Sequence, residues 1–109
     1  MKMIKLDAID STNSYLKRLL TKDSLDDLTV VVSKHQTKGK GRNGNIWENE
    51  ASLNLAFSIY KKFNNLDVKD KFMLNVISSL SVFQLLNENN LNKMTIKWPN
   101  DIMSDNSKI

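Results

Sequence analysis

The residues best suited to chemistry in this sequence lie in one short segment that carries glycine and positive charge. The chain has three glycines, and all of them, Gly39, Gly41 and Gly44, fall within six residues. Residues 34–47 contain five potential cations and no acid: Lys34, His35, Lys38, Lys40 and Arg42. Glycine lets backbone N–H groups approach an anion closely, and the basic side chains add charge. The segment therefore predicts a loop that binds a phosphate or a carboxylate.

The same letters fit several known glycine loops, and their context argues against each. The spacing G-x-G-x-x-G is that of dinucleotide-binding folds, but there the last glycine opens a helix, whereas residues 53–60 are strand-like. A P-loop needs lysine and then serine or threonine after the last glycine, and here Asn45 and Ile46 follow. A kinase-type loop would require a catalytic-loop motif, which is absent.

Two other interpretations of the loop stay open at this point. One is an exposed hairpin loop with no ligand, which is a common fate of polar connections. The other is a groove for nucleic acid, although single-strand binders usually interleave several aromatic residues and this loop has only Trp47.

Strands and helices alternate around this loop and must position it. Apolar alternation predicts strands at residues 3–9 and 53–60, and a β-branched run predicts a buried strand at 28–33. A further strand is predicted at 93–97, with a return arm from 102. One helix is predicted after the capping residues 10–13, because Tyr15, Leu16, Leu19 and Leu20 recur at helical spacing until residues 21–27 break the pattern. A second helix is predicted at 68–87, where a stripe from Phe72 to Leu86 indicates core packing. Small serines at 78, 79 and 81 favour close packing of that helix on a sheet. This order predicts an α+β domain, a mainly antiparallel sheet with helices on one face.

The composition limits the classes of protein and site. The 109 residues carry 16 basic and 12 acidic side chains, a net charge of +4, and 40% of them are hydrophobic, as in a folded soluble protein. The absence of cysteine excludes disulfides and cysteine metal sites, and a single histidine, His35, excludes a histidine metal site or a serine–histidine triad. No apolar run resembles a signal peptide or a membrane span, so we expect a cytoplasmic protein without membrane contact. Because 14 of the 16 basic residues are lysine, the mild charge does not itself indicate nucleic acid.

Four segments resemble the biotin protein ligases, in the family's order and across nearly the whole chain. Residues 39–47, GKGRNGNIW, are similar to the family's G-R-G-R-x-G-x-x-W, and residues 97–101 read K-W-P-N-D. Residues 11–13 are similar to the family's S-T-N segment, and Gln36 falls where its glycine loop begins. Lys40 and Asn45 stand where the family often has arginine, which softens the charge of the loop. The resemblance implies a fold like that of class II aminoacyl-tRNA synthetases and biotin protein ligases.

The resemblance also implies a two-step reaction. The carboxylate of biotin attacks the α-phosphate of ATP with Mg²⁺ as cofactor, which gives biotinyl-5'-AMP and pyrophosphate. The acyl group then passes to a lysine of the biotin carboxyl carrier protein of acetyl-CoA carboxylase or a related carboxylase. We expect no DNA partner, and a homodimer is compatible with the family.

Residue roles follow from the same resemblance. It implies catalytic roles for Arg42, Lys108 and Asp101, with Asp101 also on Mg²⁺. It implies biotin contacts from Ser11, Thr12, Asn13, Gln36, Gly39, Lys40, Arg42 and Lys108. It implies adenylate contacts from Gly41, Arg42, Gly44, Trp47, Lys97 and Asn100. Several of these residues have a plainer alternative: helix caps at 11–12, a core tryptophan, turn chemistry at 99–101, and solvated charges at 42 and 108.

The resemblance places residues 1–109 within a partial biotin/lipoate ligase catalytic domain. Lys108 matches a lysine seven residues beyond the K-W-P-N-D aspartate, after which the family continues with a strand of the type G-I-L-V-E. We expect the C-terminal half of that domain, the small C-terminal domain and the N-terminal DNA-binding domain to be absent, and the chain alone to turn over little. The alternatives are a lipoate ligase-like acyl-adenylating enzyme and a non-catalytic nucleic-acid-binding module that uses the basic loop.

Overall fold

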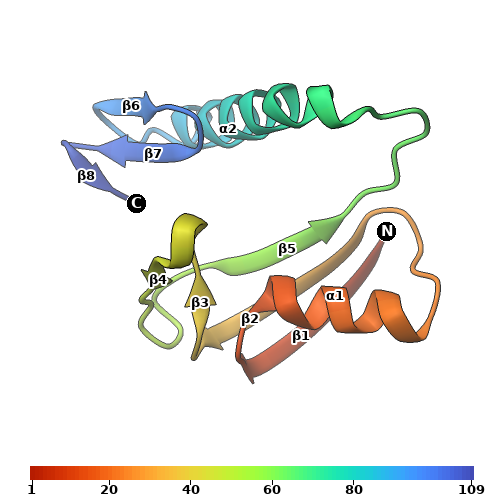
Figure 1. Cartoon of the computed structure of the whole chain (residues 1–109). Coiled ribbons are helices and arrows are strands. Elements are labelled where there is room, and N and C mark those ends of the chain that lie inside the picture. The colour runs from red at the N-terminus through yellow and green to blue at the C-terminus, as the bar shows by residue number, and fades with distance from the viewer. The chain divides into compact units, whose positions relative to one another are not determined.

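A computed structural model describes all residues 1–109 and divides them into two compact units, residues 1–63 and 64–109 (Figure 1). Unit 1 contains β1 (Lys2–Ile9), α1 (Thr12–Lys22), β2 (Thr29–Gln36), β3 (Gly39–Lys40), the short 3-10 helix η1 (Arg42–Gly44), β4 (Ile46–Trp47) and β5 (Ala56–Tyr60). Unit 2 contains η2 (Val68–Asp70), α2 (Lys71–Glu88), β6 (Met94–Lys97), β7 (Asp101–Ser104) and β8 (Ser107–Lys108). The predicted α+β class is confirmed. Neither helix is both long and apolar enough to span a membrane.

Unit 1 is built on a three-stranded sheet in the order β1-β2-β5. β1 and β2 run parallel from Lys2↔Thr29 to Ile9↔Gln36, and α1 forms the crossover between them. β2 and β5 run antiparallel, from Thr29↔Tyr60 to Ser33↔Ala56. All other strand pairs in the chain are antiparallel, so the sheets are mainly antiparallel, as predicted, with β1·β2 as the exception.

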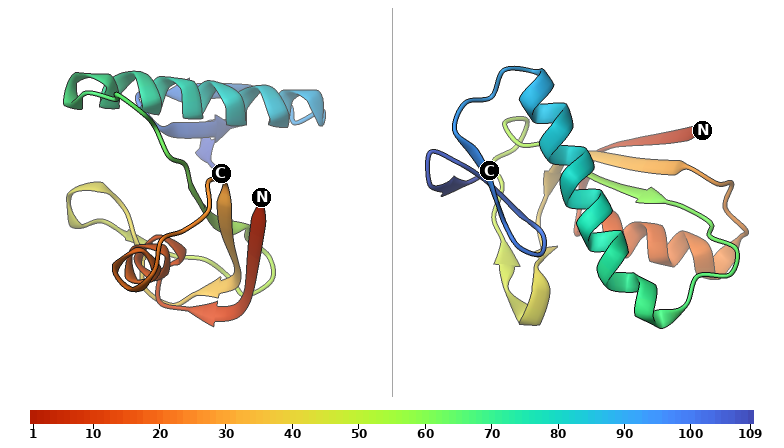
Figure 2. Two further views of the ribbon diagram at one scale, coloured as in Figure 1. Left: turned by 90° about the vertical axis from the view of Figure 1, so that its right-hand side faces the viewer. Right: turned by 90° about the horizontal axis from the view of Figure 1, so that it is seen from above.

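The core of unit 1 lies between α1 and one face of this sheet (Figure 2). The buried centre of this core is formed by Leu16 of α1, Leu25 of the α1–β2 connection, and Val31 of β2. The partly buried side chains that pack around it are Ile4, Leu6, Tyr15, Leu19 and Tyr60. Each such buried aliphatic side chain contributes about 1.5–3 kcal/mol. The spacing of Leu16 and Leu19 along α1 and the alternation of Ile4 and Leu6 along β1 therefore explain why these elements pair.

The face of β5 that packs against α1 is the polar one, whereas its apolar residues predict that the other face is buried. Ser58 stands opposite the fully buried Val31 in the sheet, on the side that faces α1. Phe57 and Ile59 point to the other face and are 46% and 54% exposed. The strand also begins at Ala56, three residues later than the expected start at Leu53. Because side chains alternate with a period of two, the polar residue at 58 is directed toward the start of α1.

In unit 2, α2 lies along the β6–β7 hairpin (Figure 2). Asp67 and Asp70 form a capping box at η2, immediately before α2, and Ile102 of β7 is the buried apolar residue of this unit. Val76, Phe83 and Leu86 are partly buried, whereas the side chains at 72, 73 and 77 are more than half exposed. The prediction that the whole apolar stripe of α2 forms core is therefore wrong, because the hairpin covers only one side of the helix.

Candidate functional site

Backbone hydrogen bonds hold the start of α1 beside the start of the glycine segment. β1 and β2 pair as far as Ile9↔Gln36. Beyond that point, the N–H of Thr37 donates to the carbonyl of Ile9 at 2.9 Å, and the N–H of Lys38 donates to the carbonyl of Asp10 at 2.8 Å. Two motifs separated by more than twenty residues are thus brought to the same end of the sheet.

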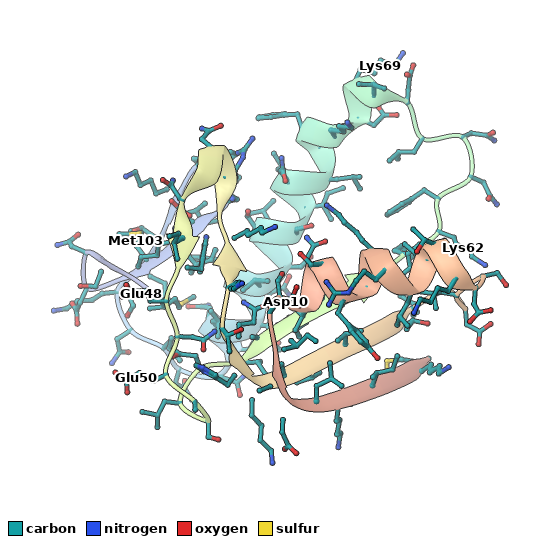
Figure 3. The ribbon with its side chains drawn as sticks, turned by 60° about the horizontal axis from the view of Figure 1, so that its bottom comes forward. Asp10, Glu48, Glu50, Lys62, Lys69 and Met103 are labelled. Carbon is teal, nitrogen blue, oxygen red and sulfur yellow. The ribbon has the colours of Figure 1, made fainter.

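A bidentate ion pair braces the turn into α1. The carboxylate of Asp10 accepts from Arg18 Nη1 and Nη2 at 2.9 and 2.8 Å, and from the N–H of Ser11 at 2.8 Å. The guanidinium holds the pKa of Asp10 well below its usual range, and the carboxylate in turn raises the pKa of Arg18. Figure 3 marks Asp10 at this turn. Since both side chains are partly exposed, the pair orients the turn more than it stabilises the fold.

In the S-T-N segment, Ser11 caps α1 and Thr12 contacts Gln36. The Oγ of Ser11 accepts from the N–H of Ser14 at 3.3 Å, so Ser11 is the N-cap of α1. Thr12 is only 2% exposed, and both its N–H and its hydroxyl donate to Oε1 of Gln36, at 2.8 and 3.0 Å. Asn13 is exposed. The structure therefore brings together Thr12 and Gln36, two of the residues assigned to biotin by the resemblance, and leaves Asn13 at the surface.

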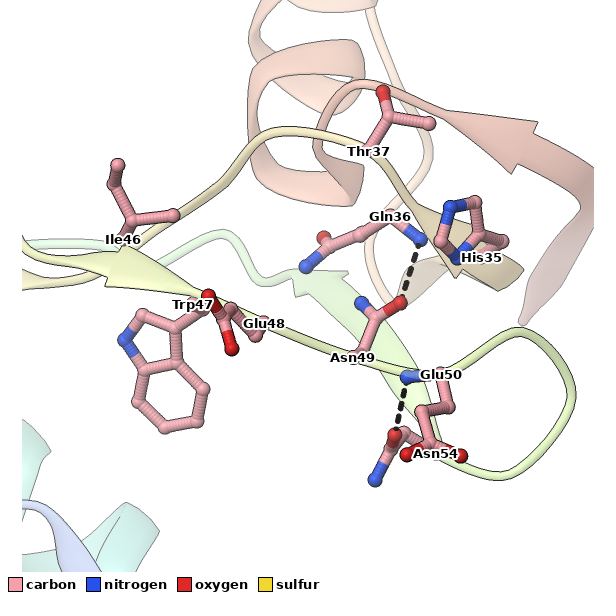
Figure 4. A pocket seen from close by; sticks show the side chains of 9 residues that line it. All are labelled: His35, Gln36, Thr37, Ile46, Trp47, Glu48, Asn49, Glu50 and Asn54. Carbon is pink, nitrogen blue, oxygen red and sulfur yellow. Dashed lines mark hydrogen bonds between the residues drawn. The ribbon is translucent and has the colours of Figure 1, made fainter.

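A cleft of about 640 Å³ opens beside Gln36 (Figure 4). The N–H of Gln36 donates to Oδ1 of Asn49 at 3.2 Å, which joins the end of β2 to the segment after β4. The N–H of Glu50 donates to Oδ1 of Asn54 at 2.8 Å, within the loop that continues from Asn49. The lining residues are His35, Gln36, Thr37, Ile46, Trp47, Glu48, Asn49, Glu50 and Asn54. A cleft of this size suits a small molecule.

The glycine segment is a short hairpin in which each glycine has a separate reason. β3 pairs with β4 through Gly39↔Trp47, and a Cβ on Gly39 would lie 2.8 Å from the Trp47 carbonyl oxygen. A Cβ on Gly41 would lie 2.5 Å from Nε1 of Trp47, so the indole ring packs directly on this residue. Gly44 has φ +77°, a conformation that side chains disfavour. The segment is a hairpin, and the Trp47 side chain is 43% exposed, so it is not a core residue.

The charges of the hairpin differ in their availability. Lys34 forms an ion pair with Asp7 at 2.8 Å, which raises the pKa of Lys34 and lowers the pKa of Asp7. Lys38, Lys40 and Arg42 are exposed or nearly so at the hairpin and join no ion pair. Three of the five predicted cations are therefore available to an anion.

The K-W-P-N-D segment forms the tight corner between β6 and β7. Lys97 and Asp101 face each other at the ends of the two strands, and Asn100 is exposed between them. The Trp98–Pro99 peptide is cis, and the buried hydroxyl of Ser79 on α2 donates to the carbonyl of Pro99 at 2.8 Å. Helix α2 thus anchors the corner from outside the hairpin.

Two predicted catalytic residues meet within unit 2. Nζ of Lys108 lies 2.9 Å from Oδ1 of Asp101, an ion pair created by the turn between β7 and β8. No group of three or more histidine, aspartate or glutamate residues that could hold a metal ion is present in residues 1–109. Asp101 is therefore a single carboxylate, which fits Mg²⁺ only if water and substrate phosphates complete the coordination shell.

The model of the biotin/lipoate A/B protein ligase family matches residues 6–109. The chain belongs to this family. It is 29% identical over 97 residues to the bifunctional ligase/repressor BirA of Salmonella typhimurium, a match that covers 89% of this chain and 29% of that protein. It is 26% identical over 104 residues to BirA of Escherichia coli, and this match covers 95% of this chain and 32% of that protein.

Solved structures agree with this membership. The biotin protein ligase of Aquifex aeolicus in complex with biotin and ATP superposes with a TM-score of 0.79 at 31% identity, over 99% of this chain and 44% of that one. The biotin acetyl coenzyme A carboxylase synthetase of Helicobacter pylori with bound biotinylated ATP gives 0.79 at 29% identity, over 99% and 51%. The chain thus spans about half the length of these solved ligases and about a third of the BirA proteins.

Three residues that contact predicted site residues, two in unit 1 and one in unit 2, were not expected from the sequence. Asn49 and Ser58 contact Gln36 and Thr12, and Ser79 holds the K-W-P-N-D corner. The small size of Ser79 predicted close packing of its helix, but not its bond to Pro99. Ser58 and Asn49 gave no signal, because a serine on a strand and an asparagine in a polar loop ordinarily face water.

Proposed function

We propose that this chain carries the biotin-binding and ATP-binding part of a biotin protein ligase. The observation that carries the proposal is the junction in unit 1 where Thr12 donates twice to Gln36 beside the glycine hairpin. Family membership and the biotin and ATP complexes of the Aquifex aeolicus relative support it.

The biotin head is assigned to unit 1. The bicyclic ureido group is neutral and polar, so its recognition requires a few fixed donors and acceptors in a sheltered pocket. Ser11, Thr12 and Gln36 supply such groups, and the first two are buried. Asn13, which follows Thr12 in α1, and Gly39 and Lys40, which form β3, complete the biotin assignment.

Positive charge is assigned to the reacting groups. When the biotin carboxylate attacks the α-phosphate of ATP, a carbon–oxygen–phosphorus linkage forms and pyrophosphate leaves. Two anions must approach each other for this step, so preorganised cations lower its barrier. Arg42, which joins no ion pair, and Lys108, which is held by Asp101, are the cations assigned to it.

The adenylate is assigned to Gly41, Gly44, Trp47, Lys97 and Asn100. Close backbone approach at the two glycines admits the nucleotide, and the half-exposed indole of Trp47 offers a flat surface for adenine. When bound, Mg²⁺ would be held by Asp101 together with substrate phosphates and would neutralise phosphate charge. In the second step, the amine of a carrier-protein lysine attacks the acyl carbon of biotinyl-AMP, the amide forms and AMP leaves. Asp101 is the residue assigned to assist this step.

Calorimetry tests the assignment of Arg42. The 109-residue chain is titrated with biotinyl-AMP and with biotin, beside the variant Arg42→Ala and the matched control Lys17→Ala, which removes an exposed cation of α1 that joins no ion pair. Loss of a charge-assisted hydrogen bond should weaken biotinyl-AMP binding about tenfold to hundredfold in Arg42→Ala only. Unchanged affinity in that variant would remove Arg42 from the site.

Two competing functions are tested with the same protein. Tighter binding of lipoic acid than of biotin would indicate a lipoate ligase-like enzyme. Binding of single-stranded oligonucleotides with a steep salt dependence would indicate a nucleic-acid-binding module.

A further inference from the structure

A hydroxyl on β5 completes the contact between Thr12 and Gln36. Oγ of Ser58 lies 2.9 Å from Oγ1 of Thr12, and it makes no other side-chain hydrogen bond. The pairing of β5 with β2 sets Ser58 opposite the buried Val31, on the face that carries α1. The serine is therefore directed at the first residue of the helix by the alternation of the strand.

The direction of these hydrogen bonds follows from counting protons. The backbone N–H of Thr12 can only donate, so the Gln36 atom 2.8 Å away must be the amide oxygen. That oxygen only accepts, so the hydroxyl of Thr12 at 3.0 Å must donate to it and thereby uses its one proton. Ser58 must then be the donor in its bond to Thr12. The three side chains form a one-way chain from Ser58 to Thr12 to Gln36.

This series of hydrogen bonds decides which atom of the Gln36 amide faces the glycine hairpin. Both acceptor positions of the Gln36 oxygen are filled by Thr12. The amide nitrogen lies on the other side, 3.0 Å from the position of a Cβ on Gly39. Figure 4 shows the Gln36 side chain reaching from β2 toward the segment of Ile46 and Trp47. A ligand beneath the hairpin therefore meets N–H donors from Gln36 and must present an acceptor such as a carbonyl oxygen.

We propose that Ser58 is a positioning residue that fixes this polarity for the ligand. Its proton occupies one lone pair of the Thr12 hydroxyl and keeps that hydroxyl directed at the Gln36 oxygen, where it acts as a second donor beside the Thr12 N–H in holding the amide. Bonds arranged in one direction also polarise and strengthen one another. The inference rests on the proposed function in one respect only, that the acceptor presented by the ligand is the ureido carbonyl of biotin.

The test compares Ser58→Ala with Ser58→Thr, which retains a hydroxyl, and Ser58→Cys, which retains the size but is a weak donor. Ser81→Ala is the control, because its hydroxyl bonds within α2 in the other unit. Two readouts are taken on the 109-residue chain. NMR three-bond couplings report the χ1 angle of Thr12 and the side-chain amide signals report Gln36. Calorimetry compares biotin with 2-iminobiotin, whose protonated guanidino group offers donors where biotin has a carbonyl.

In the wild-type chain we expect one χ1 rotamer for Thr12 and a strong preference for biotin. Ser58→Ala should average the Thr12 couplings, weaken biotin about threefold to tenfold and reduce the preference over iminobiotin, since one hydrogen bond is lost. Ser58→Cys should show the same changes to a smaller extent, and it serves as the test if Ser58→Ala does not fold. Ser58→Thr should keep the wild-type values of both readouts. Wild-type couplings and an unchanged biotin preference in the alanine and cysteine variants would overturn the proposal. If the wild-type chain binds no biotin, the proposed function fails, and the NMR couplings alone then decide the role of Ser58.

Discussion

Single atoms decide which side chains the glycine hairpin tolerates. The indole of Trp47 occupies the space in which Gly41 would carry a Cβ, whereas Gly44 has no neighbour within 4 Å and is required only by its positive φ. The two positions therefore favour glycine for different reasons, one steric and one conformational. This difference gives a matched pair of substitutions.

Gly41→Ala should displace the indole of Trp47, because the new methyl group would stand 2.5 Å from Nε1 and 2.7 Å from Cδ1. Gly44→Ala should leave the ring in place and cost about 1 kcal/mol of local backbone strain. Both changes are made in a Trp98→Phe background, so that Trp47 is the only fluorophore of its kind. We expect a red-shifted emission in Gly41→Ala alone. Equal emission in the two variants would contradict packing of the indole on Gly41.

The ion pair of Asp10 and Arg18 should make the turn into α1 sensitive to acid. Because the folded-state pKa of Asp10 lies below its unfolded value of 3.8, the pair contributes stability above that pH and loses it as the pH falls through the folded-state pKa. Arg18→Ala should raise the pKa of Asp10 toward its ordinary value. An NMR titration of the Asp10 carboxyl carbon measures this shift. Lys17→Ala, the neighbouring control on α1, should leave the titration unchanged, and a shift of equal size there would indicate a general charge effect.

At the scale of elements, local sequence pattern predicted which helices and strands exist better than it predicted how they pack. The existence of β1, α1, β2 and α2 follows from apolar periodicity and caps, because both are local properties. The buried face of β5 did not follow, since Phe57 and Ile59 are the better core residues and yet the small Ser58 faces α1. The helix lies so close to the sheet there that two hydroxyls touch, which a hydrophobic pattern cannot express.

The candidate site was predictable to a similar extent. The family resemblance assigns Thr12 and Gln36 to one site, because both belong to recognised segments of the sequence. The ion pair of Asp101 and Lys108 depends on the turn at residues 105–106, where both residues adopt positive φ. The turn sets the geometry of this ion pair, which the residue types of Asp101 and Lys108 alone do not predict. The bonds from Ser58 and Ser79 depend on long-range packing and gave no local signal.

Helix α2 should control the order of the K-W-P-N-D corner through Ser79. Ser79→Ala leaves the Pro99 carbonyl without its donor at a buried position, which should cost about 1 kcal/mol. Faster amide hydrogen exchange at residues 100–102 is the expected sign. Ser81→Ala removes a hydroxyl of the same helix that bonds only to the Ile77 carbonyl, so exchange at the corner should not change. Equal protection in Ser79→Ala and the wild-type chain would show that the hairpin holds its corner unaided.

At the scale of the whole molecule, apolar burial is unevenly divided between the two units. Of the five buried apolar residues, Leu16, Leu25, Val30 and Val31 belong to unit 1, and only Ile102 belongs to unit 2. Each such residue contributes about 1.5–3 kcal/mol, whereas the exposed apolar side chains of α2 contribute little within their own unit. Unit 1 should therefore be the more stable part of the 109-residue chain, and it is the part that holds the Ser58–Thr12–Gln36 chain.

This imbalance predicts separate unfolding transitions. Methyl NMR signals of Val31 report unit 1 and those of Ile102 report unit 2, and in a urea titration the native Ile102 signal should disappear first. Val31→Ala should lower the stability of unit 1 by about 2 kcal/mol, as followed through the methyl signals of Leu16 and Leu25, and should leave the transition of Ile102 where it was, because the core around Val31 is confined to residues 4–60. Ile102→Ala is the matched change in unit 2 and should leave the transition of unit 1 where it was. A single common midpoint that moves with either substitution would mean that the two units unfold as one cooperative body, and the stability of the Thr12–Gln36 contact would then depend on both.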